Sequence, residues 1–170
     1  LSNSMNLSIT FRAGGTSLSG QAISDSILII TSRNFSNFKI ASDVSYISLE
    51  PALTGAQVNG LLARYSKKIG PDPASINAAM IGGIAANNAS GMCCGISQNS
   101  YKTLKSMKLI FSDGTKLDTS CEKSKDSFRK THGEFLKNLK SCSDDTKANE
   151  ELRAKIERKY KIKNTCGYSL

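Results

Sequence analysis

The sequence predicts an α+β fold, because short strand-like runs come first and helices lie between and after them. Residues 27–30 (Ile-Leu-Ile-Ile) form a short continuous apolar run of the kind found in buried strands. From residue 124 onward, apolar side chains recur instead at helical spacing among many charged ones. A chain of 170 residues is one domain or a domain and a half, long enough to bury a core.

The first strand is expected at Leu7–Phe11, where apolar and polar residues alternate before a glycine-rich loop. The apolar run at 27–30 is the second strand, and residues 34–37 have turn character. Residues 44–49 predict a third strand, which ends before Pro51. A hairpin is expected from Lys108–Phe111, the turn Ser112-Asp113-Gly114 and Lys116–Asp118.

Three helices are expected. Thr54 can cap a helix that runs to about Lys68 and stops at Gly70. Periodic apolar residues then predict one helix over 124–140 and a charged helix over 144–160. The last two helices carry no chemical motif.

The formal net charge of +9 is concentrated near the C-terminus, with +4 over residues 1–120 and +5 over residues 121–170. Basic and acidic residues alternate there, which is typical of a solvated helix face. Nucleic-acid binding would need fewer acidic residues and more stacking aromatics than the 6% present, so no nucleic-acid partner is expected.

The five cysteines are an odd number without Cys-x-x-Cys spacing, which argues against a disulfide framework and against a metal site. The adjacent Cys93 and Cys94 are expected to be buried thiols. This cysteine usage fits a reducing cytosolic setting, and neither a membrane span nor a signal peptide is visible in the sequence.

The glycine-rich loop at residues 11–21 (Phe-Arg-Ala-Gly-Gly-Thr-Ser-Leu-Ser-Gly-Gln) follows the first expected strand. Backbone N–H groups of such a loop can converge on an anion. Neither the P-loop pattern nor the dinucleotide fingerprint is present, and a simple turn is the alternative.

The central stretch of the sequence, residues 69–92, is nearly free of charge, with Asp72 its only ionised side chain, and it is rich in small residues after the Pro-Asp-Pro turn. Such a stretch allows another main chain or a flat ligand to approach closely. A small-residue helix packed on a sheet is the alternative, but the paired amides of Asn87 and Asn88 beside Ser90 exceed what packing needs.

Together the two stretches resemble the FAD-binding domain of FAD-linked oxidases, of the vanillyl-alcohol-oxidase (PCMH) type. The resemblance is carried by Arg12-Ala13-Gly14-Gly15-Thr16-Ser17-Leu18-Ser19-Gly20, Pro71-Asp72-Pro73-Ala74-Ser75 and Ile81–Gly91, and it covers about residues 7–119. It looks closest to the D-lactate dehydrogenase and glycolate oxidase branch. It implies a partial FAD-binding domain over residues 1–120, a charged helical segment over 121–170, and a larger enzyme of which this chain is a piece.

The resemblance also implies which residues contact the cofactor. The loop would hold the FAD pyrophosphate through backbone N–H groups, at Gly14, Gly15, Thr16, Ser17, Leu18, Gly20 and Gln21. Pro71, Asp72 and Ser75 resemble the second flavin contact, where the Asp72 carboxylate is expected to accept backbone N–H bonds that shape the turn. The segment along the flavin ring and ribityl chain would be Gly82, Gly83, Asn87, Asn88, Ser90 and Gly91.

Two residues are left out of the expected site. Arg12 could add positive charge to the loop, but it precedes the loop on a strand, where it can equally face outward, and it is left out of the site. Many relatives attach the flavin covalently through a histidine in the loop, where this chain has Thr16. The only histidine, His132, is expected to be an ordinary surface or half-buried residue, so the FAD should be bound without a covalent bond.

The implied reaction is oxidation of a 2-hydroxy acid such as D-lactate or glycolate by hydride transfer to the flavin, with electrons passing to a further acceptor. No catalytic residue and no metal ligand is assigned within this chain. The expected location is the cytoplasm or the inner face of the membrane. The alternatives are a flavin-dependent reductase of the enolpyruvyl-sugar type and a non-catalytic basic module, which includes a peripheral membrane partner.

Overall fold

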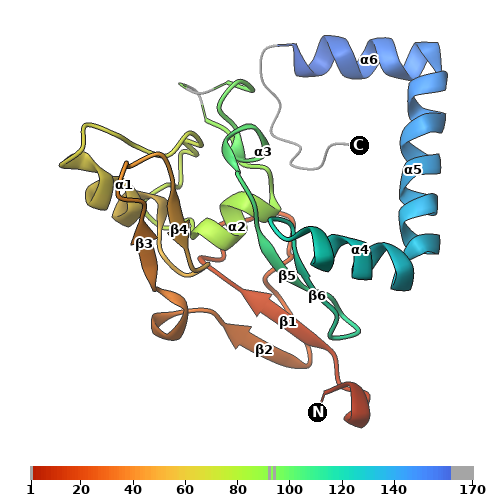
Figure 1. Ribbon diagram of the computed structural model, residues 1–170, viewed down its shortest axis with the longest axis horizontal. Coiled ribbons are helices and arrows are strands. Elements are labelled where there is room, and N and C mark those ends of the chain that lie inside the picture. The colour runs from red at the N-terminus through yellow and green to blue at the C-terminus, as the bar shows by residue number, and fades with distance from the viewer. Residues whose placement is uncertain (1, 92, 94, 162–170) are drawn as a thin grey trace. The chain divides into compact units, whose positions relative to one another are not determined.

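The computed structural model describes residues 2–91, 93 and 95–161. Figure 1 traces the chain, which divides into two compact units, residues 2–103 and residues 104–161 of the described part. Helices and strands occur in both units, so the predicted α+β class is confirmed at this level.

The first unit begins with the short 3₁₀ helix η1 (Asn3–Met5) and a parallel pair of strands, β1 (Ile9–Arg12) and β2 (Ile27–Ile30). The predicted second strand has the observed bounds, whereas the first begins and ends later than expected. Thr31 extends the pairing, because its N–H and its hydroxyl donate to the Arg12 carbonyl oxygen at 2.8 and 3.1 Å. The glycine-rich loop is therefore the connection between two paired strands.

A second strand pair carries the small core of this unit. After the 3₁₀ helix η2 (Arg33–Phe35), β3 (Phe38–Ile40) pairs antiparallel with β4 (Ile47–Leu49). The core joins Leu53, Val58 and Leu62 to apolar residues of both strands, and Val58 is completely buried. The sequence did not predict β3, and the expected strand at 44–49 was too long, because Val44 has a left-handed φ of 55°.

Helix α1 (Gly55–Ala63) packs on that core and begins as predicted. The Thr54 hydroxyl accepts from the Gln57 N–H at 3.2 Å, while the Gln57 side chain accepts from the Thr54 N–H at 2.8 Å. The expected end near Lys68 was wrong. Ser66 takes a left-handed φ of 54°, and the Ser66 and Lys67 N–H groups donate back to Ala63 and Leu62, which closes the helix.

Two short helices complete the first unit, α2 (Ile81–Ala86) and α3 (Ser100–Thr103). The buried Ser100 hydroxyl lies within 2.8 Å of the Ile84 carbonyl oxygen and 3.1 Å of the Ala89 carbonyl oxygen. It therefore satisfies backbone oxygens at the C-terminal end of α2 and ties the two helices together.

In the second unit, β5 (Lys108–Ile110) and β6 (Lys116–Asp118) form the predicted antiparallel hairpin. The helices differ from expectation: α4 (Glu122–Thr131), α5 (Gly133–Ala148) and α6 (Glu150–Tyr160) replace two longer ones. Breaks fall at His132 and at Asn149, whose side chain caps α6 by accepting from the Leu152 N–H at 3.0 Å. Apolar periodicity continued through both breaks, so it could not locate them.

Aromatic side chains join the hairpin to α4. The Phe111 and Phe128 rings lie 4.7 Å apart between centroids, and the His132 ring stacks on Phe128 at 4.2 Å. His132 Nε2 lies 3.0 Å from an Asp113 carboxylate oxygen, and its side chain is 17% exposed. Of the two expected environments, surface or half-buried, the structure shows the half-buried one.

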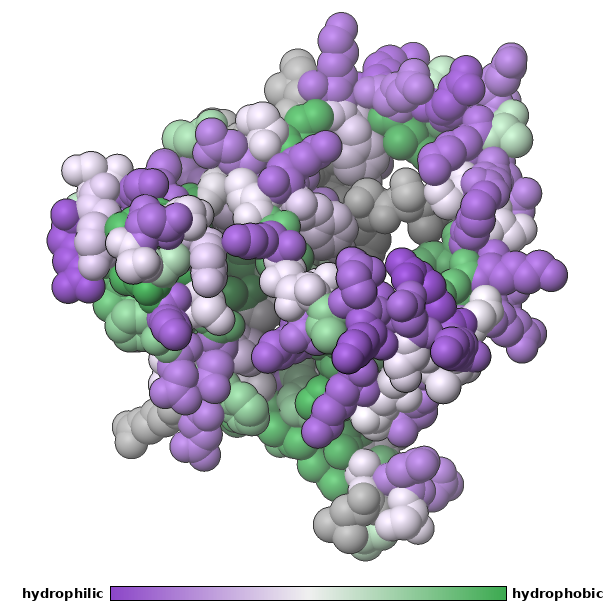
Figure 2. All heavy atoms as spheres, in the orientation of Figure 1, coloured by the Kyte–Doolittle hydropathy of each residue, from purple (hydrophilic) through white to green (hydrophobic). Residues whose placement is uncertain are grey.

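Helices α5 and α6 have hydrophilic surfaces (Figure 2). Lys140 pairs with Asp144, Lys155 with Glu151 at 2.6 Å, and Arg153 with Glu157 at 3.7 Å. These pairs along each helix are what the alternating charges predicted. None of the described helices is long and apolar enough to cross a membrane.

The described cysteines Cys93, Cys121 and Cys142 are free and exposed. The expectation that Cys93 is buried was therefore wrong, since it follows Gly91 in a loop rather than in a packed helix. Its neighbour Cys94 lies outside the described residues.

Candidate functional site

The glycine-rich loop lies at the C-terminal end of β1, where the chain leaves the strand pair. Its base is half-buried at Ala13 and Gly14, and every residue from Gly15 to Gln21 is exposed. Leu18 makes almost no contact with the rest of the molecule, at 102% exposure. The paired strands fix both ends of the loop, and the main chain in its middle is exposed to solvent.

The loop offers backbone donors. Among the described residues, no acceptor pairs with the N–H groups of Gly14, Gly15, Thr16, Ser17 and Leu18. The Ser19 N–H points back to the Ser17 hydroxyl at 3.5 Å, and the Ser17 hydroxyl donates to Gln21 at 2.5 Å. A run of unpaired N–H groups beside positive-φ glycine is the geometry that binds anions.

The loop base lies directly on the small-residue stretch. A Cβ on Gly14 would collide with the Ala78 carbonyl oxygen, and one on Gly83 would lie 3.8 Å from the Ala13 Cβ. Figure 1 shows β1 ending beside α2. The structure thus brings the first and third predicted motifs together, as a shared site requires.

The Pro-Asp-Pro segment joins the same assembly. Gly91, which is buried, approaches the backbone of Asp72 so closely that a Cβ there would collide with the Asp72 carbonyl group. Pro71 is buried and Ser75 half-buried, and the Ser75 carbonyl oxygen accepts from Ala78 and Ala79 N–H groups at 2.8 and 2.7 Å. Among the described residues no N–H donates to the Asp72 carboxylate, so the expectation that it accepts turn-shaping backbone bonds was wrong.

The third motif begins as a helix, so the small-residue helix considered as an alternative is present at Ile81–Ala86. Gly82 packs on Pro51, where a Cβ would lie 2.7 Å from the Pro51 Cβ, whereas Gly83 is exposed. One of the two amides is used internally: the Asn88 side-chain oxygen accepts from the Tyr101 N–H at 3.1 Å. Asn87 is exposed and, like the half-buried Ser90, has a side chain with no hydrogen bond among the described residues.

The sequence analysis considered Arg12 and left it out of the site. Its guanidinium does not face away from the loop but lies against Gly15, where a Cβ would be 2.8 Å from the Arg12 Nε atom. The available signal was its position immediately before the loop, combined with the absence of any other basic residue before Arg33.

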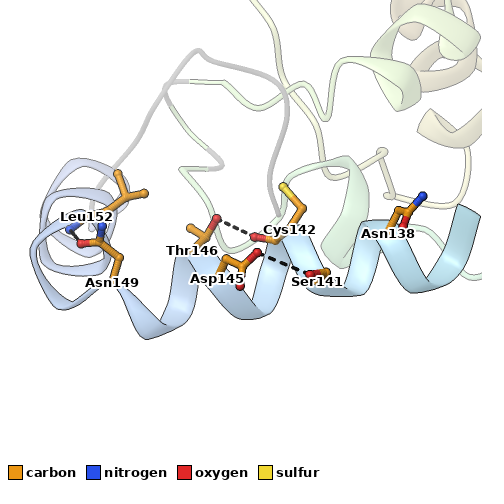
Figure 3. A pocket seen from close by; sticks show the side chains of 7 residues that line it. All are labelled: Asn138, Ser141, Cys142, Asp145, Thr146, Asn149 and Leu152. Atoms are coloured by element: carbon orange, nitrogen blue, oxygen red, sulfur yellow. Dashed lines mark hydrogen bonds between the residues drawn. The ribbon is translucent and has the colours of Figure 1, made fainter.

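The second unit holds none of the predicted contact residues. It has an open hollow of about 560 Å³ along α5 and the start of α6, lined by Asn138, Ser141, Cys142, Asp145, Thr146, Asn149 and Leu152 (Figure 3). Ser141 donates to Asp145 at 3.4 Å and Thr146 to the Cys142 carbonyl oxygen at 2.8 Å, so these polar groups satisfy one another. Across the described ranges, no cluster of side chains suited to a metal ion occurs.

Comparison with known proteins identifies the family of the chain. A family model described as an FAD binding domain matches residues 1–120, which contain the loop and both companion segments. No curated protein matches the chain. The site residues fit a dinucleotide, because unpaired loop amides suit a pyrophosphate and the exposed Gly83 leaves main chain open to a flat ring.

Proposed function

The chain belongs to the family of FAD binding domains, with FAD as its cofactor, and we propose that it serves an enzyme that oxidises a 2-hydroxy acid. The observation that supports this site is the row of unpaired N–H groups from Gly14 to Leu18, seated on the Ala78 main chain. Two phosphate charges can be matched there by aligned backbone dipoles.

The proposed roles follow from what each segment exposes. Gly14, Gly15, Thr16, Ser17 and Leu18 hold the pyrophosphate, with Gly20 and Gln21 closing the loop. Pro71, Asp72 and Ser75 form the turn beside it through main-chain contacts, of Asp72 with Gly91 and of the Ser75 carbonyl oxygen with the Ala78 and Ala79 N–H groups. Exposed Gly83 leaves main chain open for the flavin ring or ribityl chain, while Asn87 and Ser90 offer polar groups to the ring edge.

When bound, FAD would supply the chemistry of hydride acceptance and of onward electron transfer to a second acceptor. The work of this chain is to bind and orient the cofactor by main-chain contacts. We assign no catalytic residue to the described part, and the substrate-side groups are proposed to come from elsewhere in the enzyme. With Thr16 where many relatives have a histidine, the flavin is proposed to be non-covalent.

The partners and location are proposals of the same kind. We propose a 2-hydroxy acid such as D-lactate or glycolate as substrate, a separate electron acceptor, and no nucleic-acid partner. The proposed location is the cytoplasm or the inner face of the membrane. Binding to heparin or anionic vesicles that is lost at moderate salt, without any flavin, would favour the basic-module alternative.

An absorption spectrum of the parent enzyme, taken before and after anaerobic addition of substrate, tests the proposal. Flavin bands that survive dialysis and bleach with D-lactate or glycolate are expected. Bleaching with NADPH alone would indicate a reductase of the enolpyruvyl-sugar type instead. After acid precipitation the flavin should stay in the supernatant, and yellow colour in the pellet would contradict non-covalent binding.

A further inference from the structure

The Arg12 side chain is the feature that the assigned roles leave unused. Its main chain is fixed at the end of β1, because the Arg12 carbonyl oxygen accepts both bonds from Thr31. From there its guanidinium folds back over the loop, so that a Cβ on Gly15 would lie 2.8 Å from Nε and 2.9 Å from Nη2. Gly15 has a φ of 63°, and its missing side chain leaves the room that the guanidinium occupies.

No carboxylate of the described chain neutralises this guanidinium. Arg12 is exposed and belongs to none of the ion pairs, whereas Arg129 and Arg153 each pair with an acidic residue on their own helix. A cation without an internal partner, placed against main chain whose N–H groups are also unpaired, is complementary to an anion.

Arg12 is the only basic residue in the sequence segments that form the site. It is the only Lys or Arg before Arg33, and residues 69–91 contain none. Asp72 is the one acidic side chain in the companion segments. Backbone dipoles alone would otherwise have to offset both charges of a pyrophosphate.

We propose that Arg12 is a phosphate-binding residue of the FAD site, whose guanidinium closes over Gly15 and donates to pyrophosphate oxygens. A guanidinium presents two parallel N–H donors that match phosphate oxygens, which an ammonium group does not. The inference rests on the proposed placement of the pyrophosphate on this loop. Packing of Arg12 on Gly15 without any ligand contact is the competing explanation.

The test is FAD binding to the 170-residue chain, followed by flavin fluorescence at low and at moderate salt, with thermal unfolding measured in parallel. Arg12→Gln is expected to raise the Kd for FAD by about 10- to 100-fold and to flatten its salt dependence. Arg12→Lys should recover part of the affinity. Arg64→Gln is the matched control: the Arg64 guanidinium lies just after α1, 4.8 Å from the Tyr65 ring centre, and this variant should bind FAD as the unchanged chain does.

The outcomes separate the two proposals. Unchanged FAD affinity and salt dependence in Arg12→Gln, together with loss of binding in Gly14→Ala, would overturn the role of Arg12 and leave the loop site intact. Unchanged affinity in both variants would overturn the loop site itself. Arg12→Gln could instead lose FAD affinity together with thermal stability while the salt dependence of binding stays unaltered. That result would show that Arg12 only packs on Gly15, and it would overturn the proposal.

Discussion

The carbonyl oxygen of Ala78 fills the space that a Cβ on Gly14 would need. Two segments far apart in the sequence, the loop after β1 and the stretch before α2, therefore meet main chain to main chain. Only glycine permits this close approach. The contact between Gly14 and Ala78 holds the base of the loop whose N–H groups are unpaired.

Replacing Gly14 by alanine should separate the loop from its support. Because the added methyl group would collide with backbone rather than with a flexible side chain, we expect a loss of about 1 to 3 kcal/mol in unfolding free energy and a marked fall in FAD affinity. Denaturant unfolding and FAD titration check this.

Gly60→Ala is the control for that variant. Gly60 lies in α1 with open space where its Cβ would be, so alanine should preserve FAD binding and raise stability by about 1 kcal/mol or less. Equal unfolding free energies and equal FAD affinities in Gly14→Ala and Gly60→Ala would contradict the packing of the loop on Ala78.

The neighbouring glycines of α2 should respond in opposite ways. A Cβ on Gly82 would lie 2.7 Å from the Pro51 Cβ, so Gly82→Ala should lower the unfolding free energy by about 1 to 3 kcal/mol. Gly83→Ala meets only an ordinary 3.8 Å contact and should leave the fold as stable or slightly more stable.

FAD affinity distinguishes a ligand-contact role of Gly83 from a role in packing alone. If the ring or ribityl chain lies on this exposed main chain, Gly83→Ala should weaken FAD binding while the chain stays fully folded. Full FAD affinity in Gly83→Ala would remove Gly83 from the proposed contacts and leave its neighbours untouched.

The end of α1 gives a prediction about stability alone. Ser66 holds a left-handed φ of 54° at a position where helices commonly place glycine. Ser66→Gly should raise the unfolding free energy by about 0.5 to 1 kcal/mol, because the strain of a side chain in this conformation is removed. The measurement is denaturant unfolding followed by circular dichroism.

Ser48→Gly is the matched change in extended backbone. Ser48 is exposed in β4, so glycine there should lower stability rather than raise it. A destabilised Ser66→Gly would mean that α1 does not end in the observed turn.

Local chemistry made several features predictable. Thr54 and Gln57 satisfy each other at the start of α1, and the turn at Ser112-Asp113-Gly114 carries its own signal, so both were located from neighbouring residues alone. The loop and its two companion segments were likewise recognisable as motifs. Features set by one short stretch of residues are the ones that a sequence discloses.

Other features depend on residues distant in the sequence or on one backbone angle. The expected end of α1 followed the basic pair after Tyr65, but the left-handed Ser66 ended the helix first. Phe128 and Phe135 are spaced as on one continuous helix, although the chain breaks at His132 between them. The meeting of Gly14 with Ala78 and the folding of Arg12 over Gly15 arise only once the strands are paired.

The turn of the β5–β6 hairpin should make the second unit sensitive to acid. Asp113 accepts from the Thr115 N–H and hydroxyl, each at 2.8 Å, and lies 3.0 Å from His132 Nε2. The Thr115 N–H bond first, then the Thr115 hydroxyl and His132, hold the pKa of Asp113 below its usual 3.8. The carboxylate form is therefore favoured by folding.

The sign of the effect follows from this lowered pKa. Below about pH 4 the unfolded chain binds a proton at Asp113 more readily than the folded chain does, so the stabilisation is present above that pH and is lost as the pH falls further. Thermal unfolding from about pH 5 to about pH 3 should show a falling midpoint, and Asp113→Asn should make that fall shallower. Asp25→Asn, at an exposed residue without an ion pair in the described chain, should follow the unchanged protein. An equally steep fall in Asp113→Asn would show that the carboxylate does not hold the hairpin to α4.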